Sequence, residues 1–102
     1  MQALLSAPNS PAGVRFGEVP EPLPQAGEVV IEVELFTLLA RNLDHAATLP
    51  TGSVPGFDAI GVVRQAAKDG SGPPPGTRVA TLTSGTAWAE ACRTRARAGD
   101  RA

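Results

Sequence analysis

Glycine and proline interrupt this chain so often that they decide which elements it can form. They supply 11 and 10 of its 102 residues, and both disfavour the interior of a helix or strand. The apolar runs between them are short, and several alternate with polar residues, which indicates strands with one buried face. The pattern is therefore typical of a mainly β domain, either a small barrel or a sandwich.

The segment 28–36 gives the clearest strand, because its apolar residues alternate with glutamates and are expected to face the core. This apolar face comprises Val29, Ile31, Val33 and Leu35. Further strands are expected at 2–6, 14–19, 58–65, 78–83 and 85–90. Gly61, inside one of them, indicates a bulge or a close approach of two backbones. The prolines at 20, 22 and 24 predict an extended connector.

Residues 39–48 are rich in alanine and leucine and contain no glycine or proline, which predicts one short helix. This segment also holds the densest cluster of polar side chains. His45 is the only residue that titrates near neutral pH without help, and Arg41 would share its face of the helix. Two interpretations stay open, a solvated helix surface and a substrate-facing site. In the second, Asn42, Asp44 and His45 are the candidate catalytic residues.

The inventory of side chains argues against several kinds of site. One cysteine, Cys92, cannot form an internal disulfide, and one cysteine with one histidine supplies too few ligands for a typical zinc site. The glycine-rich loop 70–76 lacks the spacing of a nucleotide fingerprint, and its prolines remove the amide donors that would hold a phosphate. We therefore expect this chain alone to bind neither a metal nor a cofactor.

Charge is distributed unevenly along the chain, although the sum is only −1. Residues 1–91 carry five basic and nine acidic side chains, whereas residues 92–102 carry four arginines and one aspartate. We expect a β domain over 1–91 and a basic, disordered tail over 92–102. The alternative is an electrostatic arm that docks on the acidic body or on a partner. Nucleic acid is not an expected partner, because the basic residues form no aromatic-interleaved face.

The chain shows no signal for a membrane or for export. It contains no run of 18 apolar residues that could cross a bilayer. Its first residues lack the basic region of a secretory signal. A cytoplasmic location without a membrane partner is therefore the expectation.

Four stretches, in this order and spacing, resemble the N-terminal GroES-like domain of the medium-chain dehydrogenase/reductase superfamily, in its zinc-independent quinone-oxidoreductase-like branch. They are Gly17–Val33, with its repeated prolines before Gly-Glu-Val-Val; Val54–Val63, with Val-Pro-Gly-Phe-Asp; Gly76–Val79; and Gly85–Glu90. The resemblance covers about residues 1–90. It implies a small, partly open GroES-like barrel with one short helix around residues 39–48, and these 102 residues are expected to include no Rossmann domain.

The resemblance also bears on the site residues. Zinc-dependent members carry a cysteine after the long strand and a histidine before the acidic residue of the second stretch. Here Arg41 or Asn42 and then Phe57 stand in those places, which implies no catalytic zinc. Quinone-reductase-type members often carry Asn-x-x-Asp at the substrate cleft. This chain has Asp44 one residue too early and His45 at the expected spacing, so Asn42 is implied as the residue nearest a substrate pocket.

Family enzymes continue into a Rossmann domain that holds NADPH, and this chain stops before such a unit. The resemblance therefore implies a truncated or stand-alone substrate-side domain of a reductase, unable to transfer hydride alone. Its partners would be a small-molecule substrate and a separate Rossmann-domain protein. Two alternatives stay open. One is a cofactor-free small-molecule enzyme or binder of the cyclase, dehydratase or isomerase type. The other is a non-catalytic module that forms homo-oligomers.

Overall fold

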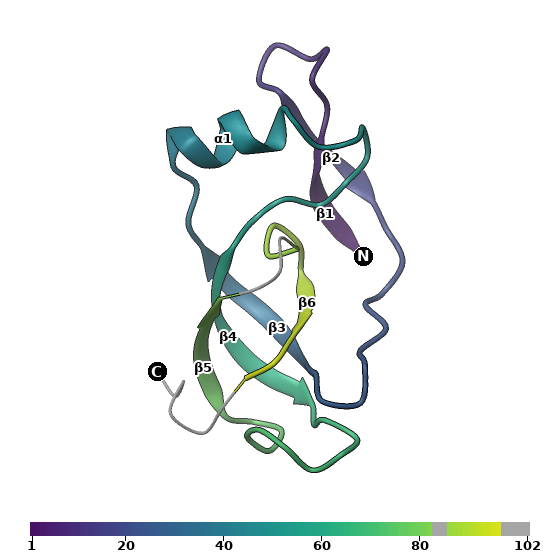
Figure 1. The fold of residues 1–102 in the computed structure, drawn as a ribbon, viewed down its shortest axis with the longest axis vertical. Coiled ribbons are helices and arrows are strands. Elements are labelled where there is room, and N and C mark those ends of the chain that lie inside the picture. Colours follow the sequence, from purple (N-terminus) through teal and green to yellow (C-terminus); the bar gives the residue numbers. More distant parts are fainter. Residues whose placement is uncertain (83–85, 97–102) are drawn as a thin grey trace.

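The computed structural model describes residues 1–82 and 86–96, which form six strands and one short helix (Figure 1). Strands β1 (Gln2–Ser6) and β2 (Val14–Glu18) make an antiparallel pair. The other four strands form one antiparallel sheet in the order β5-β4-β3-β6. They are β3 (Val29–Phe36), β4 (Asp58–Gln65), β5 (Arg78–Leu82) and β6 (Ala91–Thr94). The mainly β fold expected from the sequence is confirmed.

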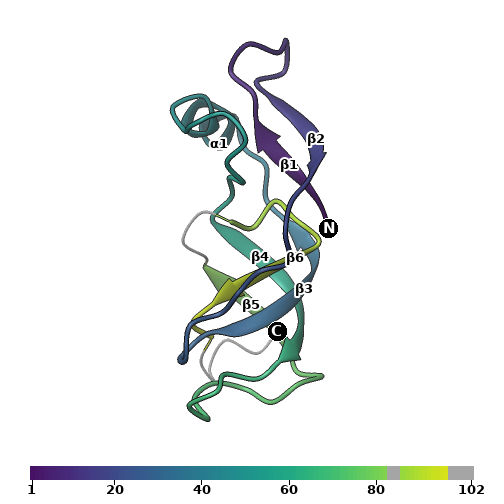
Figure 2. The same cartoon turned by 90° about the vertical axis from the view of Figure 1, so that its right-hand side faces the viewer.

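The four-stranded sheet curls toward a barrel without closing. Its edge strands are β5 and β6, and the Thr94 hydroxyl of β6 donates a hydrogen bond to the Leu82 carbonyl of β5 at 3.0 Å. Two views at right angles place the β1–β2 pair and the helix at one end of the molecule, and the turns that join β4 to β5 at the other (Figures 1 and 2). The result is a small, partly open barrel, as the resemblance implied.

The helix α1 (Ala40–Ala46) lies between β3 and β4 in the chain, within the expected segment 39–48. Its first turn is closed by a hydrogen bond from the Leu39 backbone N–H to the Asn42 carboxamide oxygen at 2.8 Å. Of the helices in the described part of the chain, none has the length and apolar character needed to cross a bilayer.

Gly61 of β4 lies close against the backbone of β3, a close approach of the kind predicted. A Cβ atom on Gly61 would lie 2.0 Å from the Glu32 carbonyl oxygen of β3, so a side chain would force the strands apart. The pairing register then shifts between Val33 and Leu35. Such a shift reverses the faces of the residues beyond it. The predicted burial of Leu35 is therefore wrong, since this side chain is 60% exposed.

Trp88 is the largest fully buried side chain among the described residues. Its indole N–H donates to the Thr37 carbonyl at 3.0 Å, and its ring centre lies 5.8 Å from that of Phe36. Gly56 adopts φ +109°, and a Cβ atom there would lie 2.5 Å from the indole. The turn before β4 is thus shaped around this one ring.

The segment before β6 corrects two predictions. The strand expected at 85–90 is wrong, because in its described part only Ala89 makes an isolated bridge, with Ala3; residues 83–85 lie outside the described residues. The strand begins instead at Ala91 and crosses the predicted domain end at residue 91. Cys92 is 1% exposed and pairs with Ile31 of β3. The folded sheet therefore includes residues 92–94 of the tail predicted for 92–102, while residues 97–102 lie outside the described residues.

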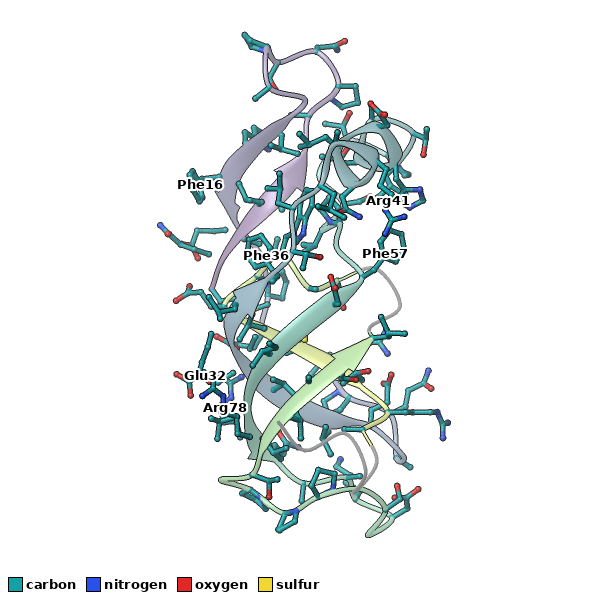
Figure 3. The ribbon with its side chains drawn as sticks, turned by 90° about the vertical axis from the view of Figure 1, so that its left-hand side faces the viewer. Phe16, Glu32, Phe36, Arg41, Phe57 and Arg78 are labelled. Atoms are coloured by element: carbon teal, nitrogen blue, oxygen red, sulfur yellow. The ribbon has the colours of Figure 1, made fainter. Side chains whose placement is uncertain are left out.

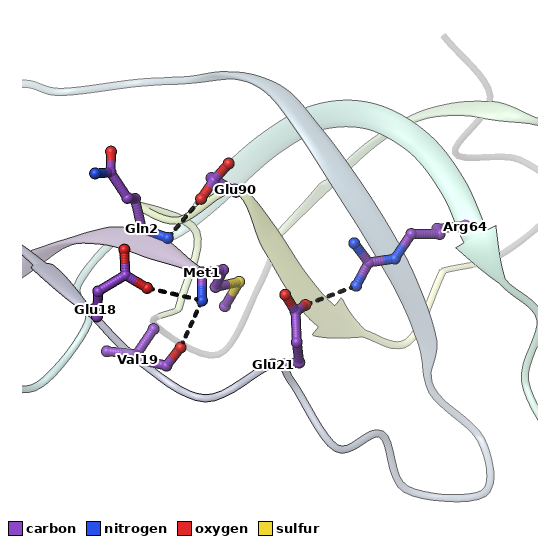
Figure 4. A network of polar contacts seen from close by, with 7 residues as sticks. All are labelled: Met1, Gln2, Glu18, Val19, Glu21, Arg64 and Glu90. Atoms are coloured by element: carbon purple, nitrogen blue, oxygen red, sulfur yellow. Dashed lines mark hydrogen bonds and ion pairs between the residues drawn. The ribbon is translucent and has the colours of Figure 1, made fainter.

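Polar contacts at the start of the chain fix the first strand and the proline connector (Figure 4). The Met1 amino group donates to the Val19 carbonyl at 2.8 Å and lies 3.2 Å from the Glu18 carboxylate. Farther along, the Arg64 guanidinium of β4 lies 3.0 Å from the Glu21 carboxylate in the connector. Because these carboxylates are exposed, each ion pair is expected to add little to stability.

Substituting Gly56 tests the packing around Trp88. Gly56→Ala is expected to lower the free energy of unfolding by about 1–3 kcal/mol more than Gly52→Ala does. Gly52 is the matched control, since it also has a positive φ (+88°), but no atom lies within 4 Å of the position that a Cβ would take there. Both variants then carry backbone strain, but only the new methyl group of Gly56→Ala clashes with the Trp88 indole. Urea unfolding measures the difference, and equal losses would contradict the packing argument.

Glu28 gives a pH test of the β3–β6 junction. Burial raises the pKa of Glu28, but the Gln25 N–H at 2.9 Å and the Arg93 guanidinium at 2.7 Å outweigh it and hold the pKa below its usual value. This stabilisation of the fold is present above the ordinary pKa of 4.5 and is lost as the pH falls through the lowered value. Glu28→Gln should cost about 1 kcal/mol at neutral pH.

Urea unfolding of Glu28→Gln at several pH values checks this. Between about pH 3 and pH 5 its stability should depend less on pH than that of the wild type. Glu32→Gln is the control, because Glu32 is exposed on β3, four residues after Glu28, and forms no ion pair within residues 1–82 and 86–96. An unchanged pH dependence in Glu28→Gln would show that the Glu28 contacts do not stabilise the fold.

Cys92 tests whether β6 is folded. Burial raises the pKa of the Cys92 thiol to about 11, from an ordinary value of 9.0. Because the thiolate is the reactive form, alkylation of the native protein should run at least about 100-fold slower than that of a free thiol at neutral pH. Mass spectrometry after iodoacetamide treatment measures this, with the urea-unfolded chain as the fully reactive control. Rapid labelling of the native chain would show that Cys92 is exposed and that β6 is not folded.

Candidate functional site

A pocket of about 420 Å³ lies where α1, the segment before it and the start of β4 meet. Helix α1 supplies the side chains of Arg41, Asn42 and His45 to its lining. Phe57 directly precedes β4 and Asp58 is the first residue of that strand; Figure 3 shows Arg41 and Phe57 side by side at the pocket. A volume of this size is within the range of small-molecule sites.

Asn42 is 9% exposed and is held in place by its own helix. Its carboxamide oxygen accepts the Leu39 backbone N–H, so the carboxamide NH₂ is the group left to meet a ligand. The sequence did not reveal this second role of Asn42 in closing the first turn of α1. The same hydrogen bond orients the side chain in the pocket.

His45 lies beside the aromatic residue of the pocket. Its ring centre is 5.0 Å from that of Phe57, with an angle of 49° between the two ring planes. No hydrogen bond of the imidazole to residues 1–82 or 86–96 is seen, so both ring nitrogens are available to a ligand. A histidine can donate or accept at this position according to its tautomer.

The three candidate catalytic residues are only partly brought together. Asn42 and His45 are three positions apart on α1 and line the same pocket, as helical spacing predicts. Asp44 is exposed and does not line it. Their catalytic roles stay predictions. The substrate-facing interpretation therefore fits two of the three residues, and the solvated-surface interpretation fits Asp44.

Sequence reasoning missed the part of the pocket that comes from other elements. The Thr37 hydroxyl donates a hydrogen bond to the Asp58 carboxylate, and both residues line the pocket together with Leu82 of β5. Phe57 was singled out only because it stands where a zinc ligand would be. No sequence motif joins Thr37, Asp58 and Leu82, because only the tertiary fold brings them to one pocket.

The pocket opens toward a larger apolar groove of about 840 Å³ along β3, β4 and β5. The two hollows share Thr37, Asp58 and Leu82. Leu82 is 77% exposed, and Leu35, which also lines the groove, is 60% exposed. A cluster of exposed leucines of this kind marks a surface suited to an apolar ligand or to another protein surface.

The described residues hold no metal-ligand cluster, and the two segments most like a phosphate loop do not fit a dinucleotide. Across residues 1–82 and 86–96, no three histidine, cysteine, aspartate or glutamate side chains gather closely enough to hold a metal ion. In the loop 70–76, prolines remove three amide donors and Pro73 is buried. The first turn of α1 is capped by its own Asn42. Neither of these two segments therefore forms a cradle for a pyrophosphate.

Comparison with known proteins shows which solved structures share this fold. The chain matches no protein-family model and no curated protein. It resembles the solved structure of human synaptic vesicle membrane protein VAT-1 homolog-like protein, with 28% identity and a TM-score of 0.83. That match covers 93% of this chain and 32% of the other.

Two further solved structures show the same domain. A quinone oxidoreductase from Coxiella burnetii matches with 18% identity and a TM-score of 0.81, over 93% of this chain and 34% of its own. A mycobacterial protein solved in complex with NADPH matches with 22% identity and a TM-score of 0.77, over 94% and 30%. The chain thus spans about a third of the length of these structures. Its fold is that of the GroES-like N-terminal domain of the quinone-oxidoreductase-like branch of the medium-chain dehydrogenase/reductase superfamily.

Proposed function

We propose that this chain is the substrate-side domain of a quinone-oxidoreductase-like reductase that uses NADPH, and that it does not transfer hydride alone. The observation that carries the proposal is the pocket at α1, where Arg41, Asn42 and His45 meet Phe57 in a domain of this fold. The similar mycobacterial structure that contains NADPH supports the choice of cofactor. NADPH would be held by a Rossmann domain outside this chain.

The pocket residues suit an electron acceptor with a carbonyl oxygen. Hydride addition to a quinone or an enone places negative charge on that oxygen, and hydrogen-bond donors aimed at it stabilise the charge. Asn42 offers its NH₂ group and Arg41 its guanidinium, while Phe57 provides an aromatic wall. These donors would polarise the acceptor without zinc.

Separate titrations with an acceptor and with NADPH test the proposal. Tetramethyl-1,4-benzoquinone is a suitable acceptor probe, since its blocked ring does not alkylate thiols. In amide and side-chain NMR spectra, we expect saturable shifts centred on Asn42, His45 and Phe57 with the quinone, and none with NADPH alone. With both present, NADPH should be oxidised no faster than without the protein, because nothing in the chain holds the donor next to the acceptor.

Two other results would contradict the proposal. Oxidation of NADPH by the purified chain would show that it contains a complete reductase site. Absence of quinone binding at the pocket would remove the substrate-side role. Chemical conversion of a bound ligand without any redox cofactor would favour the acid–base alternative, in which His45 is the group that moves the proton. His45→Ala would then abolish that conversion.

A further inference from the structure

We infer that the pocket accepts a small planar acceptor that carries a carboxylate, and that Arg41 is the residue that binds this anion. The inference rests on the proposed function, because it names the substrate class of the same pocket. It concerns binding only and adds no chemical step.

Arg41 of α1 differs from the arginines of the four-stranded sheet in having no partner in the described structure. Arg64, Arg78 and Arg93 each lie within 3.3 Å of a glutamate carboxylate. Arg41 forms no ion pair or side-chain hydrogen bond with residues 1–82 or 86–96, yet it lines the pocket. The planar guanidinium binds carboxylates through two parallel hydrogen bonds. Its available donors therefore point to an anionic group on the ligand.

The polar groups near Arg41 leave its guanidinium donors unpaired within residues 1–82 and 86–96. Asp58 is the one carboxylate among the described lining residues; it accepts the Thr37 hydroxyl and lies beyond ion-pair distance of the Arg41 guanidinium. Asp44, on the same helix, lies outside the pocket lining. The Asn42 NH₂ adds a second donor beside Arg41, because the carboxamide oxygen is bound to Leu39. The α1 side of the pocket thus presents hydrogen-bond donors to the oxygen atoms of a ligand.

The remaining wall is apolar and fits a flat body. Phe57 and His45 place two rings 5.0 Å apart, and Leu39 and Leu82 are 49% and 77% exposed at the pocket. A conjugated or aromatic group could cover these side chains and remove them from water. A conjugated carboxylate combines both features, with its charge at Arg41 and its planar body on Phe57.

A matched pair of probes tests the inference. Cinnamate and cinnamamide share a planar body and differ in the charged group. NMR titration of the wild type should show about tenfold tighter binding of cinnamate. Arg41→Met should remove this preference by weakening cinnamate about tenfold while leaving cinnamamide unchanged. Added salt should weaken cinnamate binding alone.

Arg15→Met is the control, because Arg15 is exposed on β2 and its one side-chain hydrogen bond within the described residues goes to the neighbouring Phe16 carbonyl. It removes the same charge and should leave both probes unaffected. Equal affinity of the wild type for the two probes, or equal losses of cinnamate binding in Arg41→Met and Arg15→Met, would overturn the carboxylate inference. If the quinone still binds, the proposed function survives that result. If no probe and no quinone binds, both fail.

Discussion

The buried indole of Trp88 is the contact on which the arrangement of this domain depends. Its ring N–H holds the carbonyl of Thr37 at the end of β3, and its backbone N–H donates to the Pro55 carbonyl before β4. Its own carbonyl accepts the Leu4 N–H of β1 at 2.8 Å. One residue therefore ties the two sheets together and sets the distance between the segments that bear Thr37 and Phe57. Because both of these line the pocket, core packing and pocket shape are coupled.

Much of the fold could be predicted because glycine, proline and alternation act locally. Strands 2–6 and 58–65 have the expected ends, and the helix lies inside the expected segment. The predictions from sequence are wrong where tertiary contacts determine which residues are buried. Leu35 is exposed because a register shift beyond Gly61 changes the face of the strand. Cys92 and Thr94 are buried in β6 because alternate residues of a strand share one face, while Arg93 between them turns away and pairs with Glu28. The arginines at every second position made the sequence of this strand look like a basic tail with no apolar face to bury.

The candidate site could be predicted only in its helical part. Spacing along a helix brings Arg41, Asn42 and His45 to one pocket and turns Asp44 away from it. The contributions of Thr37, Asp58 and Leu82 come from three elements distant in sequence, and no motif joins them. The closing of the helix by Asn42 was also hidden, since asparagine is commoner before a helix than at its third position. Yet that contact decides which end of the carboxamide meets a ligand.

The domain, as we interpret it, supplies the oxygen-binding half of a reductase site and leaves the hydride donor to another domain. The central claim is that an acceptor is oriented by α1, with its polar end at Arg41 and Asn42. A crystal structure of the chain with cinnamate bound would test this most directly. We expect carboxylate oxygens within hydrogen-bond distance of the Arg41 guanidinium and the Asn42 NH₂, with the ring against Phe57. A ligand seated instead in the groove along β3, β4 and β5, away from α1, would contradict it.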